Sequence, residues 1–283
     1  MRPPYNPKVW EDVNCPFCHS EKKKLYEKFG DRLQYTYVKC QQCKLIYYSP
    51  RPKYDKDFLE AAYEKYFVFD PNYEYAEKEL WEFREEIHEM IGFDKDQSSM
   101  LDVGSCMGSF IKVAKDVYRE VEGVEISENM ASFTEQKLGV RIIRKQFESI
   151  EHKKKYSCIH MSHVIEHIPN PNEWMHKAGE LLEKDGILVI CIPNIHSLAR
   201  EIKIFLKRIG LRTGRWEDSW RTPDHLFEPA IGSMKYLCKK NGFDIINYYT
   251  YSRKDPVSRK ILSQLIHKRL RIGSNVRFYL RKA

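Results

Sequence analysis

Between residues 99 and 194, short apolar runs alternate with segments that have helical spacing. The runs are "MLDVGS", "EVEGVEIS", "VRIIRKQ", "YSCIHMSH" and "GILVICIPN", and helical segments such as "SFIKVAKDVY", "ENMASFTEQKLG" and "NEWMHKAGELLEKDG" separate most of them. Strands that are joined through helices run parallel, and the helices cover both faces of their sheet. The sequence therefore predicts an α/β fold with a mostly parallel sheet, in which ligands bind beyond the carboxyl ends of the strands.

Two C-x-x-C pairs stand in the first 50 residues, Cys15 with Cys18 in "NCPFCHS" and Cys40 with Cys43 in "KCQQCKL". Each pair can place two thiolates on one metal ion, and two pairs complete a tetrahedral Zn²⁺ site with bonds of about 2.3 Å. A segment of this length buries little core, so the metal would supply folding energy. We therefore predict a structural zinc-ribbon module over residues 1–52, with two unrelated redox pairs as the alternative.

The compartment and the partners are limited by composition. No apolar run approaches the roughly 18 residues that span a bilayer, and the N-terminus lacks an apolar signal segment. We expect a cytoplasmic protein whose eight cysteines are ligands or core residues rather than disulfides. The net charge of +8 is concentrated at the C-terminus, because residues 251–283 hold ten Lys or Arg and one acid and the remainder is at −1. A nucleic-acid enzyme would more often spread basic residues around its catalytic face.

Residues 53–95 are aromatic and charged, and we predict that they form a helical linker or cap. Apolar residues recur about once per helical turn from Tyr73 to Ile91. Tyr63 and Tyr66 are candidates for lining the entrance of a site, although aromatic packing is the simpler interpretation for most of this stretch.

The stretch "LDVGSCMGSF" connects the first strand to the first helix of the alternating region. Asp102 and Gly104 fall at the end of the strand, and Gly108 opens the helix. Glycine allows a tight turn and a close approach of the backbone to a ligand. Glu125 ends the second strand, 23 residues after Asp102, where a carboxylate can bind both hydroxyls of a ribose. This pattern predicts a nucleotide-type cofactor, and an ordinary non-binding connection is the alternative.

Five motifs in one order carry a resemblance to a known family. The series "LDVGSCMGSF", "VEGVEIS", "HVIEHIPNP", "LLEKDGILVICIPN" and "DHLFEPAIGSMKYLCKKNGF" resembles the class I S-adenosylmethionine-dependent methyltransferases. The branch that it is most similar to has an N-terminal cysteine zinc-binding module and acts on sugar, lipid-linked or secondary-metabolite substrates. The resemblance covers nearly the whole chain. It implies a Rossmann-like sheet, with residues 96–252 as the S-adenosylmethionine-binding domain and residues 253–283 as a basic amphipathic helix and a final strand.

The resemblance also implies which residues bind the cofactor. They comprise the loop after the first strand, the acid that holds the ribose and its neighbour, the adenine contacts, and the residues near the methionine part: Asp102, Gly104, Cys106 and Gly108; Glu125 and Ile126; Phe147 and Glu148; Ser162 and His163. Cys106 departs from the family, which usually has glycine there. We expect the backbone to turn at Cys106 with a negative φ, and weaker cofactor binding is one consequence that the substitution allows.

Histidines are the candidates for the chemistry of the acceptor. A hydroxyl acceptor must lose its proton, and histidine has a pKa suited to accept it. His225, in "RTPDHLFEP", follows the fifth strand, and in the resembling branch a histidine at this place is associated with the acceptor site. We predict catalytic roles for His225 and His167, with His163 as a third candidate. The alternatives are that His225 pins its loop, that His167 packs the start of a helix, and that Glu166 is structural or lies on the cofactor side.

Two segments predict basic amphipathic helices. In "SLAREIKIFLKRIG" we expect the apolar face to cover the sheet, with the bases in solvent. For "PVSRKILSQLIHKRLRIG" the same role and a contact with an anionic membrane surface, with substrate phosphates or with RNA remain open.

Three functions follow from these features. The first is methyl transfer from S-adenosylmethionine to oxygen or carbon of a small-molecule acceptor: a glycan, nucleotide sugar, lipid-linked or phosphorylated precursor, or secondary metabolite. In this case the enzyme could work at the inner membrane face through its basic C-terminal helix. The second is methylation of rRNA or tRNA, against which the zinc segment is not markedly basic. The third is S-adenosylmethionine binding without catalysis.

Overall fold

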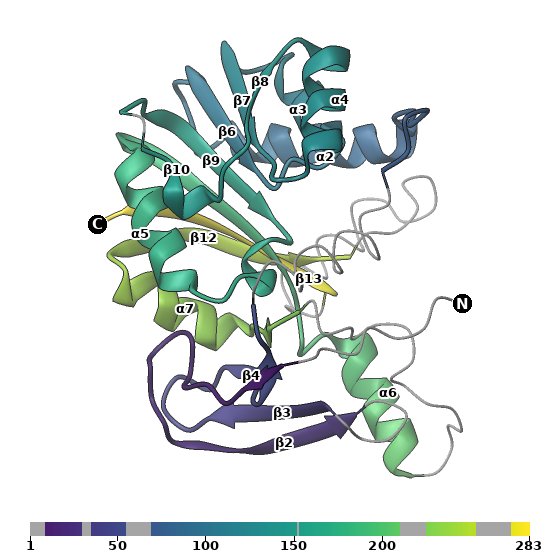
Figure 1. Ribbon diagram of the computed structural model, residues 1–283, viewed down its shortest axis with the longest axis vertical. Helices are drawn as coiled ribbons and strands as arrows, with labels where there is room; N and C mark the ends of the chain where they lie inside the picture. The colour runs from purple at the N-terminus through teal and green to yellow at the C-terminus, as the bar shows by residue number, and fades with distance from the viewer. Residues whose placement is uncertain (1–8, 30–34, 55–68, 152, 210–224, 253–272) are drawn as a thin grey trace.

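The computed structural model describes residues 9–29, 35–54, 69–151, 153–209, 225–252 and 273–283. Within these ranges the central sheet has seven strands in the order β12-β13-β10-β9-β6-β7-β8 (Figure 1). Neighbouring strands from β8 to β10 are parallel, and β13 is antiparallel to both its neighbours. The predicted α/β fold is confirmed. The strands are β6 (Ser99–Val103), β7 (Glu120–Val124), β8 (Arg141–Ile143), β9 (Tyr156–Ser162), β10 (Leu182–Pro193), β12 (Phe243–Tyr251) and β13 (Asn275–Lys282).

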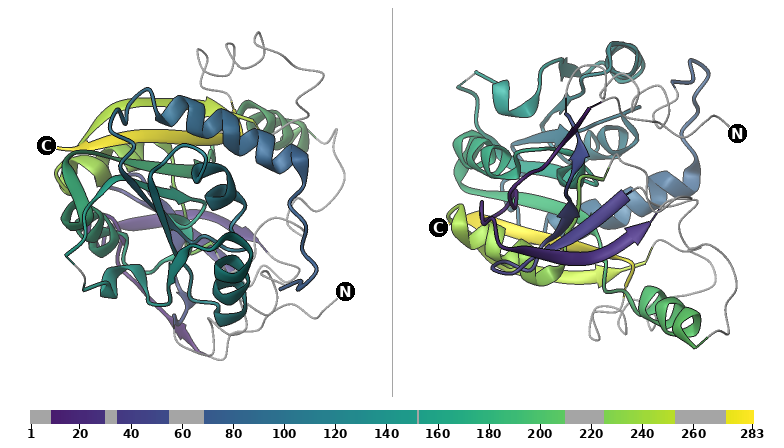
Figure 2. Two further views of the ribbon diagram at one scale, coloured as in Figure 1. Left: turned by 90° about the horizontal axis from the view of Figure 1, so that it is seen from above. Right: turned by 60° about the horizontal axis from the view of Figure 1, so that its bottom comes forward.

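Helices cover both faces of this sheet (Figure 2). One core lies under α2, α3 and α4, and the other lies under α5 and α7. Successive strand residues serve these two cores alternately, since their side chains point to opposite faces: Met100 packs in the first core, and Leu101 packs in the second. The bounds are α2 (Glu77–Met90), α3 (Ser109–Ala114), α4 (Glu128–Leu138), α5 (Pro171–Leu181), α7 (Ile231–Lys240), and the 3-10 turns η1 (Phe147–Ser149) and η2 (Ile165–His167).

The cap helix is shorter than its apolar spacing predicts. It begins at Glu77 rather than at Tyr73, because Ala76 has an extended backbone with φ −68° and ψ 130°. The segment before it lies against the loop that precedes α3: the hydroxyl groups of Tyr73 and Ser109 are 2.9 Å apart, and the Tyr75 hydroxyl donates to the Met107 carbonyl at 3.1 Å. Tyr73, which shares the helical spacing, is therefore used with Tyr75 for a tertiary contact instead.

Two helices of the alternating region also end early. The first ends at Ala114, and the helix predicted to reach Gly186 ends at Leu181. There the chain passes directly into β10, where Leu182 pairs with Tyr156 of the neighbouring strand. Pairing within the sheet has overridden the local helical spacing, as tertiary context commonly does.

The final strand belongs to the central sheet. β13 lies between β10 and β12 (Figure 1), and Val276, Phe278 and Leu280 along it are fully buried. Our sequence-based division placed this strand with residues 253–283, outside the domain that it completes. Local patterns identify such a strand but do not show that it inserts between two others.

The N-terminal segment forms a second, antiparallel sheet with the order β11-β4-β3-β2. Its fourth strand comes from far along the chain: Phe227 pairs with Tyr47, and Glu228 pairs with Ile46. In Figure 1 this sheet lies below α5 and α7, and its buried side chains are continuous with the core of that face. The strands are β1 (Trp10–Glu11), β2 (Lys23–Phe29), β3 (Tyr35–Cys40), β4 (Ile46–Tyr48), β5 (Arg51–Pro52) and β11 (Phe227–Glu228), with β1 paired to β5.

The helix α6 (Leu198–Arg208) does not cover the sheet, so our expectation for its apolar face was wrong. Leu198, Ile202, Phe205 and Ile209 are between 45% and 59% exposed, and the helix stands out beside the N-terminal sheet (Figure 1). The second basic helix, together with Tyr63 and Tyr66, lies outside the described residues. Of the helices in the described ranges, none has the length and apolar character needed to span a membrane.

A buried network of charges joins α2 to three strands of the sheet. Arg277 of β13 lies 2.8 Å from one oxygen of Glu86, and the other oxygen lies 3.2 Å from His160 Nε2. His160 Nδ1 is in turn 2.8 Å from Asp102 Oδ1. All four residues are at most 5% exposed. The cap helix is thereby connected to the end of β6 through paired charges.

These pairings set the protonation states inside the network. Burial alone would raise the pKa of Glu86, but the charge of Arg277 and the hydrogen bond to His160 hold it far below its usual range. Burial alone would lower the pKa of His160, but its bonds to Asp102, Cys191 and Glu86 raise it, so the imidazole is protonated.

We expect Arg277→Met to destabilise the protein by about 3–5 kcal/mol, because one oxygen of the buried Glu86 carboxylate would lose its cationic partner. Urea unfolding at neutral pH measures this effect. The matched control is Arg119→Met, which breaks an exposed ion pair with Asp96 and should change stability far less. Equal effects of the two substitutions would contradict a structural role for the network.

Candidate functional site

The strand order reverses between β6 and β9, because β7 and β8 lie on one side of β6 and β9 and β10 lie on the other. At such a point the connections leave in opposite directions and a crevice opens beyond the carboxyl ends of the strands. Gly104 follows β6 and His163 follows β9 at this edge. Most of the residues predicted to bind a cofactor are therefore gathered along one edge of the sheet.

The backbone conformation of the loop after β6 requires both of its glycines. Gly104 has a φ of 76°, and a Cβ atom there would lie 2.6 Å from Val164 Cγ2. Gly108 has a φ of 78°, and a Cβ atom there would lie 2.6 Å from Thr134 Cγ2. Both positions require a left-handed backbone as well as close packing, which glycine alone meets without strain.

Cys106 also turns through the left-handed region, with a φ of 48°. Our expectation of a negative φ at this position was wrong. Burial, together with the charges of Glu125 and Asp102, raises the pKa of the Cys106 thiol far above its usual range. The thiol is therefore protonated, which makes it unsuited to nucleophilic catalysis.

Glu125 closes the loop from the side of β7. One carboxylate oxygen accepts the Cys106 amide at 3.0 Å, and the other accepts the Ser127 amide at 2.8 Å. Burial raises the pKa of Glu125 above its ordinary value, although the hydrogen bonds from the two amides act in the opposite direction. A carboxylate has about four acceptor positions, so one that holds two amides can still bind hydroxyl groups.

Features beside Glu125 suit a nucleoside. Ile126 is 37% exposed and offers an apolar surface next to the carboxylate. Among the described residues, the Ser162 hydroxyl at the end of β9 and one carboxylate oxygen of Glu148 are buried without a hydrogen-bond partner. Buried polar atoms that lack a partner in the protein are sites where a ligand can supply one.

The side chains of two residues predicted to bind the cofactor make contacts inside the protein instead. Phe147 is fully buried and packs on Trp174, with ring centroids 5.1 Å apart, so its side chain has no exposed surface to offer a ligand. The Asp102 carboxylate lies within the buried network, bonded to His160. We therefore assign neither side chain a direct cofactor contact. Asp102 fixes the end of β6, from which the loop departs.

His167 and His225 come together beyond the end of β9. Their ring centroids are 4.6 Å apart at an angle of 85°, although 58 residues separate them in the sequence. Glu166 is fully buried, and one of its oxygens lies within 4.8 Å of a ring nitrogen of each histidine. His163 Nδ1 is 3.3 Å from Glu166 Oε1, and the backbone of His163 is left-handed, with a φ of 56°. Such backbone strain in a residue other than glycine is typical of functional sites.

The carboxylate of Glu166 is ionised in this setting. Burial alone would raise its pKa, but the hydrogen bond from His163 and the charges of His163, His167 and His225 lower it to about 2. The cluster therefore combines a buried negative charge with imidazoles beyond the carboxyl end of β9.

The N-terminal sheet holds the loop that carries His225. The Leu226 carbonyl accepts the Tyr48 amide at 3.1 Å, and the Leu226 amide donates to the Glu166 carbonyl at 2.9 Å. Glu228 Oε1 lies 3.6 Å from His225 Nδ1 and accepts a hydrogen bond from the Tyr37 hydroxyl at 3.3 Å. The N-terminal sheet thus fixes the position of His225. Asp224, the residue before it, lies outside the described residues.

The four predicted metal ligands also converge. The sulfur atoms of Cys15, Cys18, Cys40 and Cys43 lie within 4.8 Å of one another, and none of these cysteines is in a disulfide. The distance is 3.4 Å for Cys15 to Cys43 and for Cys18 to Cys40. Zinc–sulfur bonds of about 2.3 Å in a tetrahedron give sulfur separations of about 3.8 Å. The cluster is therefore close to the size of a four-thiolate metal site.

A methyltransferase-domain family matches residues 74–248 of the chain. The chain belongs to this family. It is a methyltransferase. The predicted enzyme class is confirmed, while the branch with a zinc-binding module stays a prediction.

Solved structures share the fold of this methyltransferase. Magnesium protoporphyrin IX methyltransferase from Synechocystis PCC 6803, solved with bound S-adenosylhomocysteine, is 14% identical and aligns with a TM-score of 0.54 over 81% of this chain and 100% of that chain. A S-adenosylmethionine-dependent methyltransferase from Archaeoglobus fulgidus is 18% identical, with a TM-score of 0.51 and the same coverage. At these identities the likeness concerns the fold. No curated protein matches the sequence significantly.

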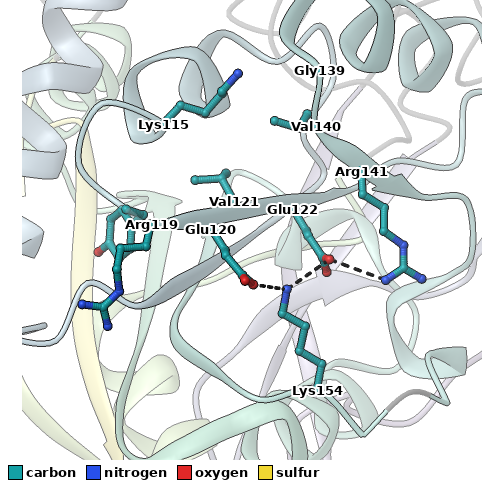
Figure 3. A pocket seen from close by; sticks show the side chains of 10 residues that line it. Lys115, Arg119, Glu120, Val121, Glu122, Gly139, Val140, Arg141 and Lys154 are labelled. Carbon is teal, nitrogen blue, oxygen red and sulfur yellow. Dashed lines mark hydrogen bonds and ion pairs between the residues drawn. The ribbon is translucent and has the colours of Figure 1, made fainter.

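A charged hollow of the methyltransferase lies at the opposite edge of the sheet, at the amino ends of β7 and β8 (Figure 3). Lys154 pairs with Glu120 at 2.7 Å and with Glu122 at 3.1 Å, and Arg141 lies 3.5 Å from Glu122. Figure 3 shows these side chains directed toward one another. The hollow is away from the carboxyl edge, so we assign it no part in methyl transfer.

Sequence reasoning missed several residues of the methyltransferase site. Glu228 stands three residues after His225, a spacing that gave a local signal. Tyr37 gave none, because its contact depends on the pairing of β11 with β4. Glu86 and His160 carried only the weak signal of polar residues at apolar positions.

We expect Gly104→Ala to cost several kcal/mol of folding stability and Gly139→Ala about 1 kcal/mol. Both glycines have positive φ, which costs alanine about 1–2 kcal/mol, but a Cβ atom at Gly139 meets nothing within 4 Å. The difference, measured by urea unfolding, therefore reports the clash with Val164. Equal costs would show that the loop can move away from Val164.

Proposed function

We propose that this methyltransferase uses S-adenosylmethionine and transfers the methyl group to a small-molecule acceptor. The observation that carries the proposal is the Glu125 carboxylate, which lies beside the glycine loop at the switch point of the sheet and is bonded to two loop amides. The family match supports methyl transfer, and the carboxylate suits the two hydroxyls of a ribose.

Different residues at this edge would bind different parts of the cofactor. Glu125 would hold the ribose, and Ile126 would pack against the adenine. Glu148 offers a buried, unpartnered oxygen near the adenine end, and Ser162 offers an unpartnered hydroxyl near the methionine end. The loop from Gly104 to Gly108 would bring its backbone close to the cofactor. S-adenosylmethionine supplies a methyl carbon that its sulfonium already activates, so the protein has to align the acceptor and exclude water.

His225 is the residue that we propose for the acceptor side. Glu228 Oε1 lies 3.6 Å from its Nδ1, and this nearby carboxylate favours the tautomer with the proton on Nδ1, in which Nε2 is the nitrogen that accepts a proton from the acceptor. His167 lies against the same ring and limits how it can turn. Two neighbouring carboxylates, Glu166 and Glu228, stabilise the positive charge that His225 gains when it accepts the proton.

The proposed class of acceptor is supported by the net charge of the chain and by exposed apolar side chains. The chain before residue 251 is nearly neutral, which fits a glycan, nucleotide sugar, lipid-linked precursor or secondary metabolite better than RNA. Three apolar side chains exposed on α6, and Ile209 directly after it, support a lipid-linked acceptor and a peripheral contact with the inner face of the membrane from a cytoplasmic enzyme. The basic C-terminal helix stays a prediction.

A structural Zn²⁺ in the four-cysteine cluster belongs to this proposal. Four thiolates fill a tetrahedral shell and leave no open position, so the ion would stabilise the module without taking part in the reaction. Because the same sheet holds β11, the ion would also stabilise the position of His225.

The proposal predicts micromolar binding of S-adenosylhomocysteine, weakened at least about tenfold by Glu125→Ala, a loss of 1.4 kcal/mol or more. Calorimetric titration measures both affinities. The control is Glu120→Ala, at the exposed start of the same strand, which should bind as the wild type does. Absence of binding to the wild type would refute the cofactor assignment.

We expect His225→Gln to retain this affinity and to lower kcat by about 10²–10⁴, the usual contribution of a general base. The measurement is S-adenosylhomocysteine release from S-adenosylmethionine with an acceptor found by screening sugar and lipid-linked compounds. Unchanged kcat in the variant would remove His225 from the chemistry.

A further inference from the structure

The acceptor-side cluster contains a buried carboxylate oxygen that lacks a partner. Glu166 is 0% exposed, and His163 occupies only its Oε1 atom. Within the described residues, Oε2 has no hydrogen-bond partner. A carboxylate oxygen that is buried without a hydrogen-bond partner is costly, so this atom points to a ligand that can pair with it.

Two imidazoles face the same place. Each of Glu166, His167 and His225 offers one ligand atom, and the three atoms lie within 4.8 Å of one another. Bonds of about 2.0–2.2 Å to nitrogen and oxygen require separations of about 3–4 Å between ligand atoms. Small side-chain rotations at the two partly exposed histidines would therefore suffice to bring all three atoms onto one ion.

The local charge matches a dication. Glu166 and Glu228 are two carboxylates in contact with this group of side chains, while neutral imidazoles contribute no charge when they bind metal through a ring nitrogen. Glu228 lies beside His225 Nδ1, as the carboxylate partner of a metal-binding histidine commonly does, and it would orient the ring so that Nε2 faces the ion.

We propose that Glu166, His167 and His225 bind a divalent transition-metal ion at the acceptor end of the active site. Two histidines and one carboxylate leave coordination positions open, in contrast to the four-cysteine cluster. The inference rests on the proposed function, because the open positions would take an oxygen of the acceptor. Imidazole and carboxylate ligands favour Zn²⁺ or Fe²⁺ over Mg²⁺.

The ion would ionise the acceptor hydroxyl. Coordination lowers the pKa of a bound oxygen acid, and the proton passes to solvent. The oxygen then forms a bond to the methyl carbon of S-adenosylmethionine as the bond from carbon to sulfur breaks, giving the methyl ether and neutral S-adenosylhomocysteine. In this form of the site His225 acts as a ligand, and the ion replaces it as the group that activates the acceptor.

The test compares how many Zn²⁺ ions the untagged, full-length protein and its variants bind. Equilibrium dialysis against Zn²⁺ followed by elemental analysis should give one ion fewer for the His167→Ala/His225→Ala variant than for the wild type. The matched control is His176→Ala, which removes an exposed histidine that is paired with Glu180 and should lose no ion. Equal metal content in the wild type and the double variant would overturn the proposal.

Cobalt titration of the wild type gives a second measurement that needs no variant. A Co²⁺ ion in the cysteine cluster produces intense thiolate charge-transfer absorption, whereas an ion bound by nitrogen and oxygen adds only weak d–d bands. We expect both signatures, in separate steps of the titration. A spectrum with the thiolate signature alone would contradict the site.

Calorimetry with S-adenosylhomocysteine separates this proposal from the function on which it rests. Normal binding of S-adenosylhomocysteine without a second metal ion would reject the metal site and leave His225 as the base. Failure of the wild type to bind S-adenosylhomocysteine would reject the cofactor assignment, whatever the metal content.

Discussion

The bonds from the Glu125 carboxylate to the amides of Cys106 and Ser127 are the interaction on which the active site depends. They hold the loop after β6 against the end of β7, and they keep a charged group at the crevice where the strand order reverses. The left-handed turn at Cys106 is compatible with this arrangement because the amide of that residue is bound. A side chain in place of glycine therefore does not prevent the turn between β6 and α3.

Two further constraints place the rest of the site around this loop. Beneath it, Glu86, His160 and Arg277 connect the cap helix and the final strand to Asp102 at the end of β6. Beyond it, the pairing of β11 with β4 makes the loop of His225 part of the cysteine-rich sheet. The N-terminal module is thus a component of the site that we propose for the acceptor. Damage to the module should affect the position of His225 before it affects the cofactor loop.

Much of this arrangement could be predicted from the sequence, because strand and helix patterns, C-x-x-C spacing and the acid after β7 are local signals. The convergence of Cys15, Cys18, Cys40 and Cys43 followed from spacing alone. The negative φ expected at Cys106 was wrong, since the hydrogen bond from its amide to the Glu125 carboxylate stabilises a turn with positive φ. The exposure of α6, the insertion of β13 and the contact from Tyr37 to Glu228 depend on segments far apart in the chain, for which no local pattern exists.

The most direct test of the account is a crystal structure of the protein with S-adenosylhomocysteine. The account predicts ligand density at the carboxyl ends of β6 and β9, with the ribose hydroxyls on the Glu125 carboxylate and the sulfur on the side of Ser162 and His163. Density elsewhere, or a loop from Gly104 to Gly108 that excludes the ligand at saturating concentration, would contradict it.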